Sequence, residues 1–296
     1  MLAERYQQMT IFECRKIYED KLSRLPKDSS VHMSDDAHAH MHLRWFHPHH
    51  ERSHKVILYF HGGSMCMGSR HSHTPFATHL CAQSRITCVL PDYRLAPEHP
   101  FPAAIEDACR AYEYLLSNGY TGNDIAICAD SGGGLLAFNV ACYARDNQLP
   151  LPACMALFAP AVCTDLVHQD DAYDDLDKRD PVLSLREMRR YSSAYLGGYT
   201  ADDPRASPLY GDLSGLPPIL SIVGSEEMML DQVRQCHIKI LKSGGKSQMV
   251  VEDGCFHAHY LLQNIIPEAR TSLQLAVSFI QKHLNPGMSH AQETPS

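Results

Sequence analysis

The turn at residues 129–133, with the sequence ADSGG, constrains the fold of this chain more than any other feature. An apolar run precedes it and a helical run follows it, so the turn joins a buried strand to a helix. A serine raised on such a turn needs residues with almost no side chain two places before and after it, because the two backbones crowd together there. Ala129 and Gly133 meet this requirement, and the turn directs the N–H of Gly132 toward any group bonded to Ser131. The pattern predicts that Ser131 is a nucleophile.

Short apolar runs alternate with helical stretches along most of the chain. Strands are expected at 56–60, 86–90, 124–128, 154–158, 217–223 and 248–252. Helices are expected at 73–83, 103–116, 135–145, 184–196, after residue 227 through 241, and at 268–284. This alternation is typical of an α/β fold, with a parallel sheet and right-handed crossovers between its strands. Active sites of such sheets lie at the carboxyl ends of the strands.

The chain before this alternation contains one predicted helix and one predicted strand. The helix ends before Pro26, and the alternation of apolar and polar residues predicts a strand over 37–45. One face of the strand would carry Ala39, Met41, Leu43 and Trp45, and the other His38, His40, His42 and Arg44. Three histidines on one face raise the question of a metal site, but no acidic or cysteine ligand accompanies them, so an exposed polar face is favoured. The same holds for the histidine-rich loop 47–54.

Composition excludes several classes of function. The chain has 296 residues and a net charge of −8 with dispersed acidic residues, which argues against nucleic acid or an anionic membrane as a partner. The charged N-terminus lacks the apolar segment of a signal peptide or membrane span, so a cytoplasmic location is expected. Eleven cysteines, an odd number without a CxxC pair, favour free buried thiols in a reducing compartment.

A nucleophilic serine needs a base and a carboxylate that orients the base. These groups should follow later strands, in the chain order serine, acid, histidine. Glu227 or Asp231 follows the strand at 217–223, and His257 follows the last strand. His257 is preferred to His259 because it comes directly after the glycine-containing loop that ends that strand.

The loop after the strand 56–60 is the candidate oxyanion hole. Paired glycines let the backbone approach the position opposite Ser131, so the N–H groups of Gly62, Gly63 and Ser64, with that of Gly132, are the expected donors. An ordinary Gly-Gly turn is the structural alternative.

Several motifs together resemble the hormone-sensitive-lipase family of α/β-hydrolases, over about residues 38–284. They are HGGS at 61–64, DYRLAPE at 92–98, FPAA at 101–104, DSGG at 130–133, SPLY at 207–210, GLPP at 215–218 and DG at 253–254. The resemblance implies a mostly parallel eight-stranded sheet flanked by helices, with a small helical cap built partly from N-terminal helices. It also implies hydrolysis of small, short-chain carboxylic esters through an acyl-enzyme, without a metal or organic cofactor. Association into a homodimer through the sheet edge is common in that family.

The resemblance also suggests site residues. It implies Ser131 as the nucleophile and His257 as the base, and the family's acidic motif falls on residues 227–231, which favours Glu227 over Asp231 or Glu226. Arg94 and Glu98 would hold the loop beneath the site. Three residues depart from the family pattern: Ala129 and Ser64 stand where glycine is usual, and Gly132 stands where alanine is usual.

The expected organisation has three parts. Residues 1–36 form an N-terminal helical cap segment, residues 37–284 the catalytic domain, and residues 285–296 a polar tail. Within the catalytic domain, residues 165–205 form either a cap insertion or a plain surface excursion. The pocket under the cap is expected to be lined by Met65, Met67, Tyr195 and Leu196. Two other functions use the same scaffold, namely cleavage of amides or formamides, as in arylformamidase-like relatives, and binding of a ligand without turnover.

Overall fold

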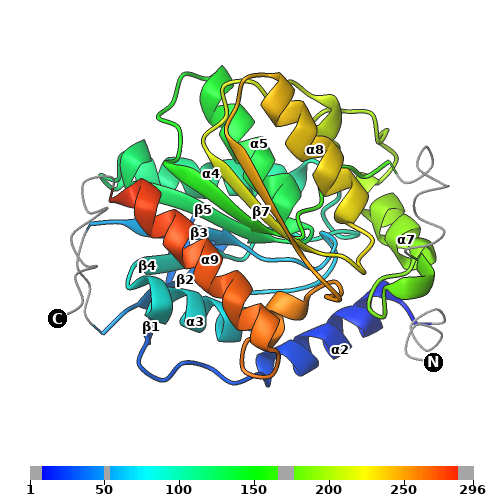
Figure 1. Cartoon of the computed structure of the whole chain (residues 1–296), viewed down its shortest axis with the longest axis horizontal. Helices are drawn as coiled ribbons and strands as arrows, with labels where there is room; N and C mark the ends of the chain where they lie inside the picture. The colour runs from blue at the N-terminus through cyan, green and yellow to red at the C-terminus, as the bar shows by residue number, and fades with distance from the viewer. Residues whose placement is uncertain (1–8, 50–53, 166–176, 286–296) are drawn as a thin grey trace.

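A twisted sheet of eight strands lies between two layers of helices in the computed structural model, which describes residues 9–49, 54–165 and 177–285 (Figure 1). The strands are β1 (His32–His38), β2 (Met41–His47), β3 (Val56–Phe60), β4 (Thr87–Pro91), β5 (Ile125–Asp130), β6 (Cys154–Phe158), β7 (Ile219–Gly224) and β8 (Ser247–Glu252). Their order is β1-β2-β4-β3-β5-β6-β7-β8. Strand β2 runs opposite to the other seven strands, so the expected mostly parallel eight-stranded α/β sheet is confirmed.

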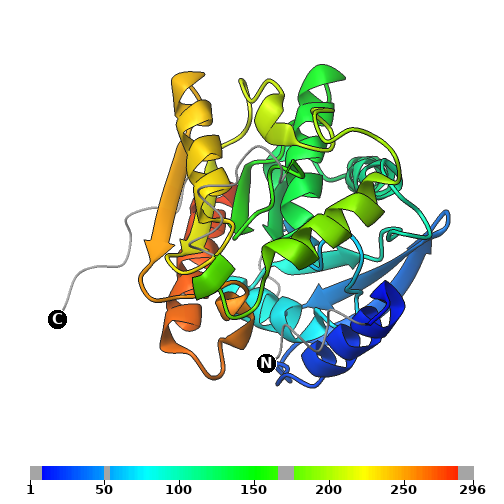
Figure 2. The ribbon, with the colours of Figure 1, turned by 90° about the vertical axis from the view of Figure 1, so that its right-hand side faces the viewer.

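Helices cover both faces of the sheet. They are α2 (Ile11–Ser23), α3 (Thr74–Ser84), α4 (Ala103–Ser117), α5 (Gly133–Asp146), α7 (Leu185–Leu196), α8 (Leu230–Lys242) and α9 (Pro267–Leu284), with short 3₁₀ turns η1 (Gly122–Asp124), η2 (Pro208–Tyr210) and η3 (His259–Leu262). Helices α3 and α9 pack on one face, and α4, α5 and most of α8 pack on the other. Helices α2 and α7 lie outside these layers, beside the carboxyl ends of the strands (Figure 2).

Local sequence explains these elements. Strands β3 to β7 are buried on both faces, which is why they are short continuous apolar runs. Helix α2 begins with a capping box, in which the Thr10 hydroxyl accepts from the N–H of Glu13 while the Glu13 carboxylate accepts from the N–H of Thr10. It ends before Pro26, as the sequence predicts.

The single strand predicted over 37–45 is wrong, because the chain turns at Ala39 (φ 54°) and forms the β1–β2 hairpin. Nearly every β1 side chain is exposed, so this edge strand lacks the apolar alternation that reveals strands in a sequence. Met41 and Leu43 do face the core. His40 lies in the turn and contacts Asp107 (2.8 Å), so the three histidines do not share one strand face.

Parts of the predicted organisation fall outside the described residues. These are residues 50–53 of the histidine-rich loop, 166–176 of the insertion and 286–296 of the tail, together with residues 1–8. Within the described part of the insertion, the helix predicted at 184–196 is present as α7.

Candidate active site

Ser131 occupies the turn between β5 and α5 in a left-handed conformation (φ 47°). Its N–H donates to the carbonyl oxygen of Phe158 on the neighbouring strand (2.9 Å), which holds the turn at the carboxyl edge of the sheet. A Cβ atom on Gly133 would lie 2.2 Å from the carbonyl oxygen of Phe60. The close approach of β3 therefore explains why the turn requires glycine at this position.

The structure brings Ser131, His257 and Glu227 into contact in series. The Nε2 atom of His257 lies 2.9 Å from the Oγ atom of Ser131, and its Nδ1 atom lies 2.7 Å from Oε2 of Glu227. All three side chains are buried or nearly so. A carboxylate on Nδ1 keeps a proton there, which leaves Nε2 free to accept the proton of the serine hydroxyl.

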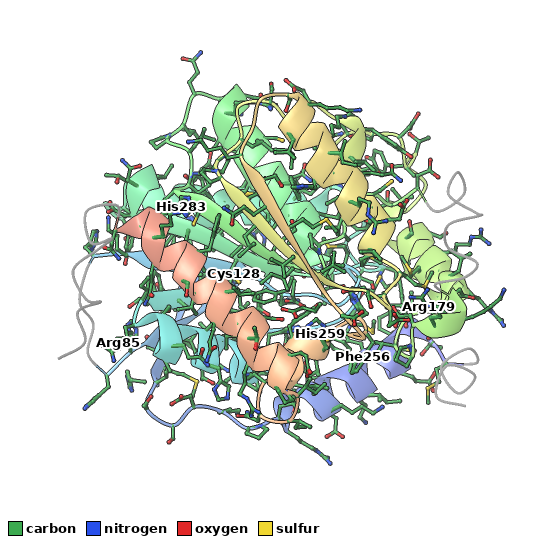
Figure 3. The ribbon with its side chains drawn as sticks, viewed as in Figure 1. Arg85, Cys128, Arg179, Phe256, His259 and His283 are labelled. Carbon is green, nitrogen blue, oxygen red and sulfur yellow. The ribbon has the colours of Figure 1, made fainter. Side chains whose placement is uncertain are left out.

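The other candidates lie elsewhere. Asp231 is on the first turn of α8 and accepts from the Gln235 amide (2.7 Å), and Glu226 pairs with Arg179 (2.7 Å). The ring of His259, labelled with Phe256 in Figure 3, contacts other groups: its Nδ1 lies 3.0 Å from the carbonyl oxygen of Phe256 and its Nε2 lies 3.3 Å from the Ser272 hydroxyl.

Charge around His257 favours its protonated form. Burial opposes a charge on the imidazole, but the hydrogen bond and negative charge of Glu227, with smaller contributions from Asp180 and Asp130, outweigh burial and raise the pKa of His257. The second Glu227 oxygen accepts from the N–H of Gly224. Asp180 accepts from the N–H of Met228 (3.1 Å), so it also supports the turn that carries Glu227.

The loop after β3 faces Ser131 with three consecutive residues in the left-handed region: Gly63 (φ 115°), Ser64 (φ 55°) and Met65 (φ 62°). Within the described residues, no acceptor binds the N–H groups of Gly63, Ser64 or Gly132, and these residues line the pockets beside the serine. They are suitably placed donors for an oxyanion.

Gly62 differs from its expected role. Its N–H donates to the Asp130 carboxylate (2.9 Å) and is therefore not directed at the serine. Asp130 also accepts from the Tyr59 hydroxyl (2.6 Å), and burial raises its pKa to about 6 against the opposing effect of these hydrogen bonds. Sequence reasoning missed this role of Asp130, because its partners come from a distant strand and loop.

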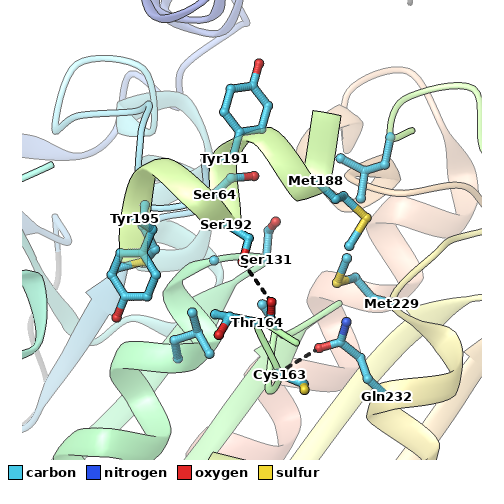
Figure 4. Close-up of a pocket in the computed structure, with 15 residues that line it drawn as sticks. Ser64, Ser131, Cys163, Thr164, Met188, Tyr191, Ser192, Tyr195, Met229 and Gln232 are labelled. Carbon is cyan, nitrogen blue, oxygen red and sulfur yellow. Dashed lines mark hydrogen bonds between the residues drawn. The ribbon is translucent and has the colours of Figure 1, made fainter. Parts of the chain in front are cut away.

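Two pockets meet at Ser131. The smaller has an empty volume of about 500 Å³ (Figure 4). Its lining includes Ser64, Met65, Gly132, Leu135, Cys163, Met188, Tyr191, Ser192, Tyr195 and Met229. The larger, of about 1160 Å³, is lined by residues that include Cys14, Tyr18, Lys21, Leu22, Gly63, Met67, Glu187, Tyr191, His257 and Tyr260.

Three of the four residues expected to line the pocket do so. Met65 and Tyr195 line the smaller pocket and Met67 the larger one, whereas Leu196 lines neither. Leu196 follows Tyr195 by one residue, a rotation of about 100° around α7 that turns it away. The contribution of α2 was not predicted residue by residue, although Tyr18 and Leu22 share a helix face at the i, i+4 spacing.

The described residues contain no group of three or more His, Cys, Asp or Glu side chains that could hold a metal ion. No helix in this part of the chain is long and apolar enough to span a membrane.

Comparisons with known proteins agree with the fold of this chain. The sequence profile of the α/β-hydrolase fold matches residues 57–261. An acetyl-hydrolase of Streptomyces hygroscopicus is 34% identical over 79% of this chain and 78% of its own length, and an esterase of Acinetobacter venetianus is 31% identical over 74% and 72%.

Solved structures are similar over nearly the whole chain. An esterase of the bacterial hormone-sensitive lipase family superposes with a TM-score of 0.90, at 31% identity over 94% of this chain and 93% of that one. The esterase EstE5 soaked with p-nitrophenyl butyrate superposes with a TM-score of 0.89, at 30% identity over 94% and 92%.

Proposed function

This chain belongs to the α/β-hydrolase family, and from that premise we propose that it is a serine carboxylic-ester hydrolase in which Ser131, His257 and Glu227 are the catalytic residues. The observation that carries the proposal is the pair of contacts made by the two nitrogen atoms of His257, at 2.9 Å to the serine and 2.7 Å to the carboxylate. The similar esterases and acetyl-hydrolase support an ester as the substrate.

The reaction follows from these contacts. His257 takes the proton of the Ser131 hydroxyl as its oxygen attacks the ester carbonyl carbon, and the carbonyl oxygen becomes negative opposite the three free N–H groups. The imidazolium, stabilised by Glu227, then protonates the departing alkoxide and leaves an acyl-enzyme. Water attacks this ester with His257 again as the base, and the acid and the free serine result.

The acyl chain and the leaving alcohol of the substrate occupy different pockets. The leaving alcohol must lie near His257, because this residue protonates it, and His257 lines only the larger pocket. The acyl chain is then directed into the smaller pocket, which is lined by Gly132 but not by His257. The bulky side chains of Met188, Met229 and Tyr195 in the wall of the smaller pocket support a preference for short acyl chains.

We also propose the finer organisation of the protein. Residues 1–36, with helix α2, and the 165–205 segment, with helix α7, act as the cap over the catalytic domain 37–284, because both helices line the larger pocket. Two copies associate through the outer edge of β8, the last strand of the sheet. A cytoplasmic location is supported by the cysteines, all eleven of which are described and are free thiols.

A panel of p-nitrophenyl esters and amides of graded acyl length tests the function. We expect turnover of acetyl and butyryl esters to exceed that of long-chain esters and of the amides. Ser131→Ala should lower kcat by about 10⁵-fold or more while the protein remains folded. Ester hydrolysis by Ser131→Ala at the original rate would refute the assignment, and turnover of amides alone would indicate an amidase.

A further inference from the structure

One face of helix α2 holds the loop that carries the oxyanion donors. Arg15, Tyr18 and Glu19 lie at the spacing i, i+3 and i+4, which places them side by side on a helix. Each contacts a residue of the segment 66–73, which begins two residues after Ser64.

Arg15 makes the most extensive of these contacts. Its Nε donates to the carbonyl oxygen of Cys66 (2.8 Å) and its Nη2 to that of Ala96 (2.8 Å). The guanidinium also forms a bidentate pair with the Glu98 carboxylate, at 2.6 and 2.8 Å. A single side chain from α2 therefore joins two loops of the catalytic domain.

The two peptide segments held by Arg15 are bonded to the residues on either side of Ser64. The N–H of Cys66 donates to the carbonyl oxygen of Gly63 (3.0 Å), and the N–H of Ala96 donates to that of Met65 (3.0 Å). Arg15 therefore binds Cys66 and Ala96, which in turn bind Gly63 and Met65, the two neighbours of the oxyanion donor Ser64.

This loop needs external support. Ser64 and Met65 both adopt left-handed φ angles, which are strained for a residue with a Cβ atom. Such a conformation persists when surrounding contacts hold it. Two further bonds from α2 act on the end of the loop: the Ser69 hydroxyl donates to Glu19 (2.5 Å), and the Tyr18 hydroxyl lies 3.4 Å from Nε2 of His73.

We propose that Arg15 is a positioning residue for the oxyanion hole, which keeps the N–H groups of Gly63 and Ser64 aimed at the substrate oxygen. Helix α2 then contributes to the chemical step as well as lining the larger pocket. The inference rests on the proposed esterase function.

Kinetics of Arg15→Ala with p-nitrophenyl acetate test this role. Because both acylation and deacylation pass through an oxyanion, we expect kcat to fall about tenfold to a hundredfold while KM changes by less than about threefold. Arg15→Lys should retain part of the activity, since one ammonium group cannot reach all three acceptors. Arg24→Ala is the matched control: this arginine is on the end of the same helix, is largely exposed and pairs only with Asp20 among the described residues, so kcat should be unchanged.

A second measurement separates positioning from general destabilisation. A trifluoromethyl ketone forms an oxyanion on the serine, whereas the matching methyl ketone binds largely as the uncharged carbonyl. Arg15→Ala should weaken inhibition by the trifluoromethyl ketone in proportion to the loss of kcat and leave inhibition by the methyl ketone unchanged. Urea unfolding confirms that each variant is folded under assay conditions.

The outcomes distinguish this inference from the function on which it rests. A wild-type protein that hydrolyses esters and an Arg15→Ala variant with the same kcat would overturn the inference alone. Equal weakening of both ketones, or a change in KM alone, would also overturn it and indicate a role in substrate binding. A wild-type protein without esterase activity would overturn both.

Discussion

The backbone around Glu227 holds its carboxylate in contact with His257. The side chain is fully buried, one oxygen accepts from the backbone of Gly224, and the other meets the imidazole. Asp231, four residues later, lies on the first turn of α8 and bonds to Gln235 on the same helix. Both carboxylates fall within the acidic motif, but only that of Glu227 contacts His257.

Alanine replacements at these two positions should therefore differ sharply. Glu227→Ala is expected to lower kcat/KM by about 10³- to 10⁴-fold, because the imidazole loses its orientation and the stabilisation of its charged form. Asp231→Ala should stay within about twofold, because its only described partner is a side chain on its own helix. Measuring kcat/KM of both variants with p-nitrophenyl acetate shows which carboxylate is the catalytic acid. Comparable losses of kcat/KM in the two variants would contradict the choice of Glu227.

Activity should fall at acid pH, with a midpoint above the ordinary pKa of histidine. A protonated imidazole cannot accept the serine proton, so activity is present above the pKa of His257 and is lost below it. The surroundings raise this pKa, chiefly through Glu227 acting against burial. The pH profile of kcat/KM gives the midpoint, and Glu227→Gln should move it to lower pH. An unchanged midpoint in that variant would mean that another group controls the profile.

At the scale of elements, α7 shows what periodicity can predict. Met188, Tyr191, Ser192 and Tyr195 all line the smaller pocket, at positions i, i+3, i+4 and i+7 of one helix face. The helix itself is predictable from this pattern, but the surface that its face covers is not, because that depends on how the chain returns from β6. Strand β1 is the opposite case, since its exposed residues leave no pattern to detect.

Shortening Met188 should widen the acyl pocket. Met188→Ala removes side-chain atoms from its wall, so kcat/KM for octanoyl relative to acetyl esters is expected to rise about threefold or more. Met33→Ala, an exposed methionine on β1, is the matched control and should leave the ratio unchanged. An unchanged ratio in Met188→Ala would show that the acyl chain occupies the larger pocket, whose lining does not include Met188.

At the scale of the whole molecule, the sheet ends in two different edges. Strand β1 is polar and exposed, whereas β8 carries Val251 (44% exposed) and lies beside α8, where Leu241 is 48% exposed. An unpaired strand beside apolar side chains favours association with a second copy.

A lysine on that edge should separate the copies. Light scattering is expected to give twice the mass of one chain for the wild-type protein and the mass of a single chain for Val251→Lys. Met33→Lys, on the opposite edge, should remain paired. A wild-type protein that scatters as one chain would remove the basis for the dimer.

The sequence by itself determined the α/β class, the helices and buried strands, the nucleophile turn and the chain order of the candidate serine, acid and base. These features depend on local periodicity, on the small residues that a tight turn needs, and on the rule that parallel strands end at one edge. Only the tertiary structure decided which carboxylate meets His257, that the Gly62 N–H serves Asp130, and that Arg15 bonds to the loop beside Ser64. Each of these is a contact between segments brought together by the packing of the sheet and its helices, so its distance and direction depend on the whole fold rather than on neighbouring residues.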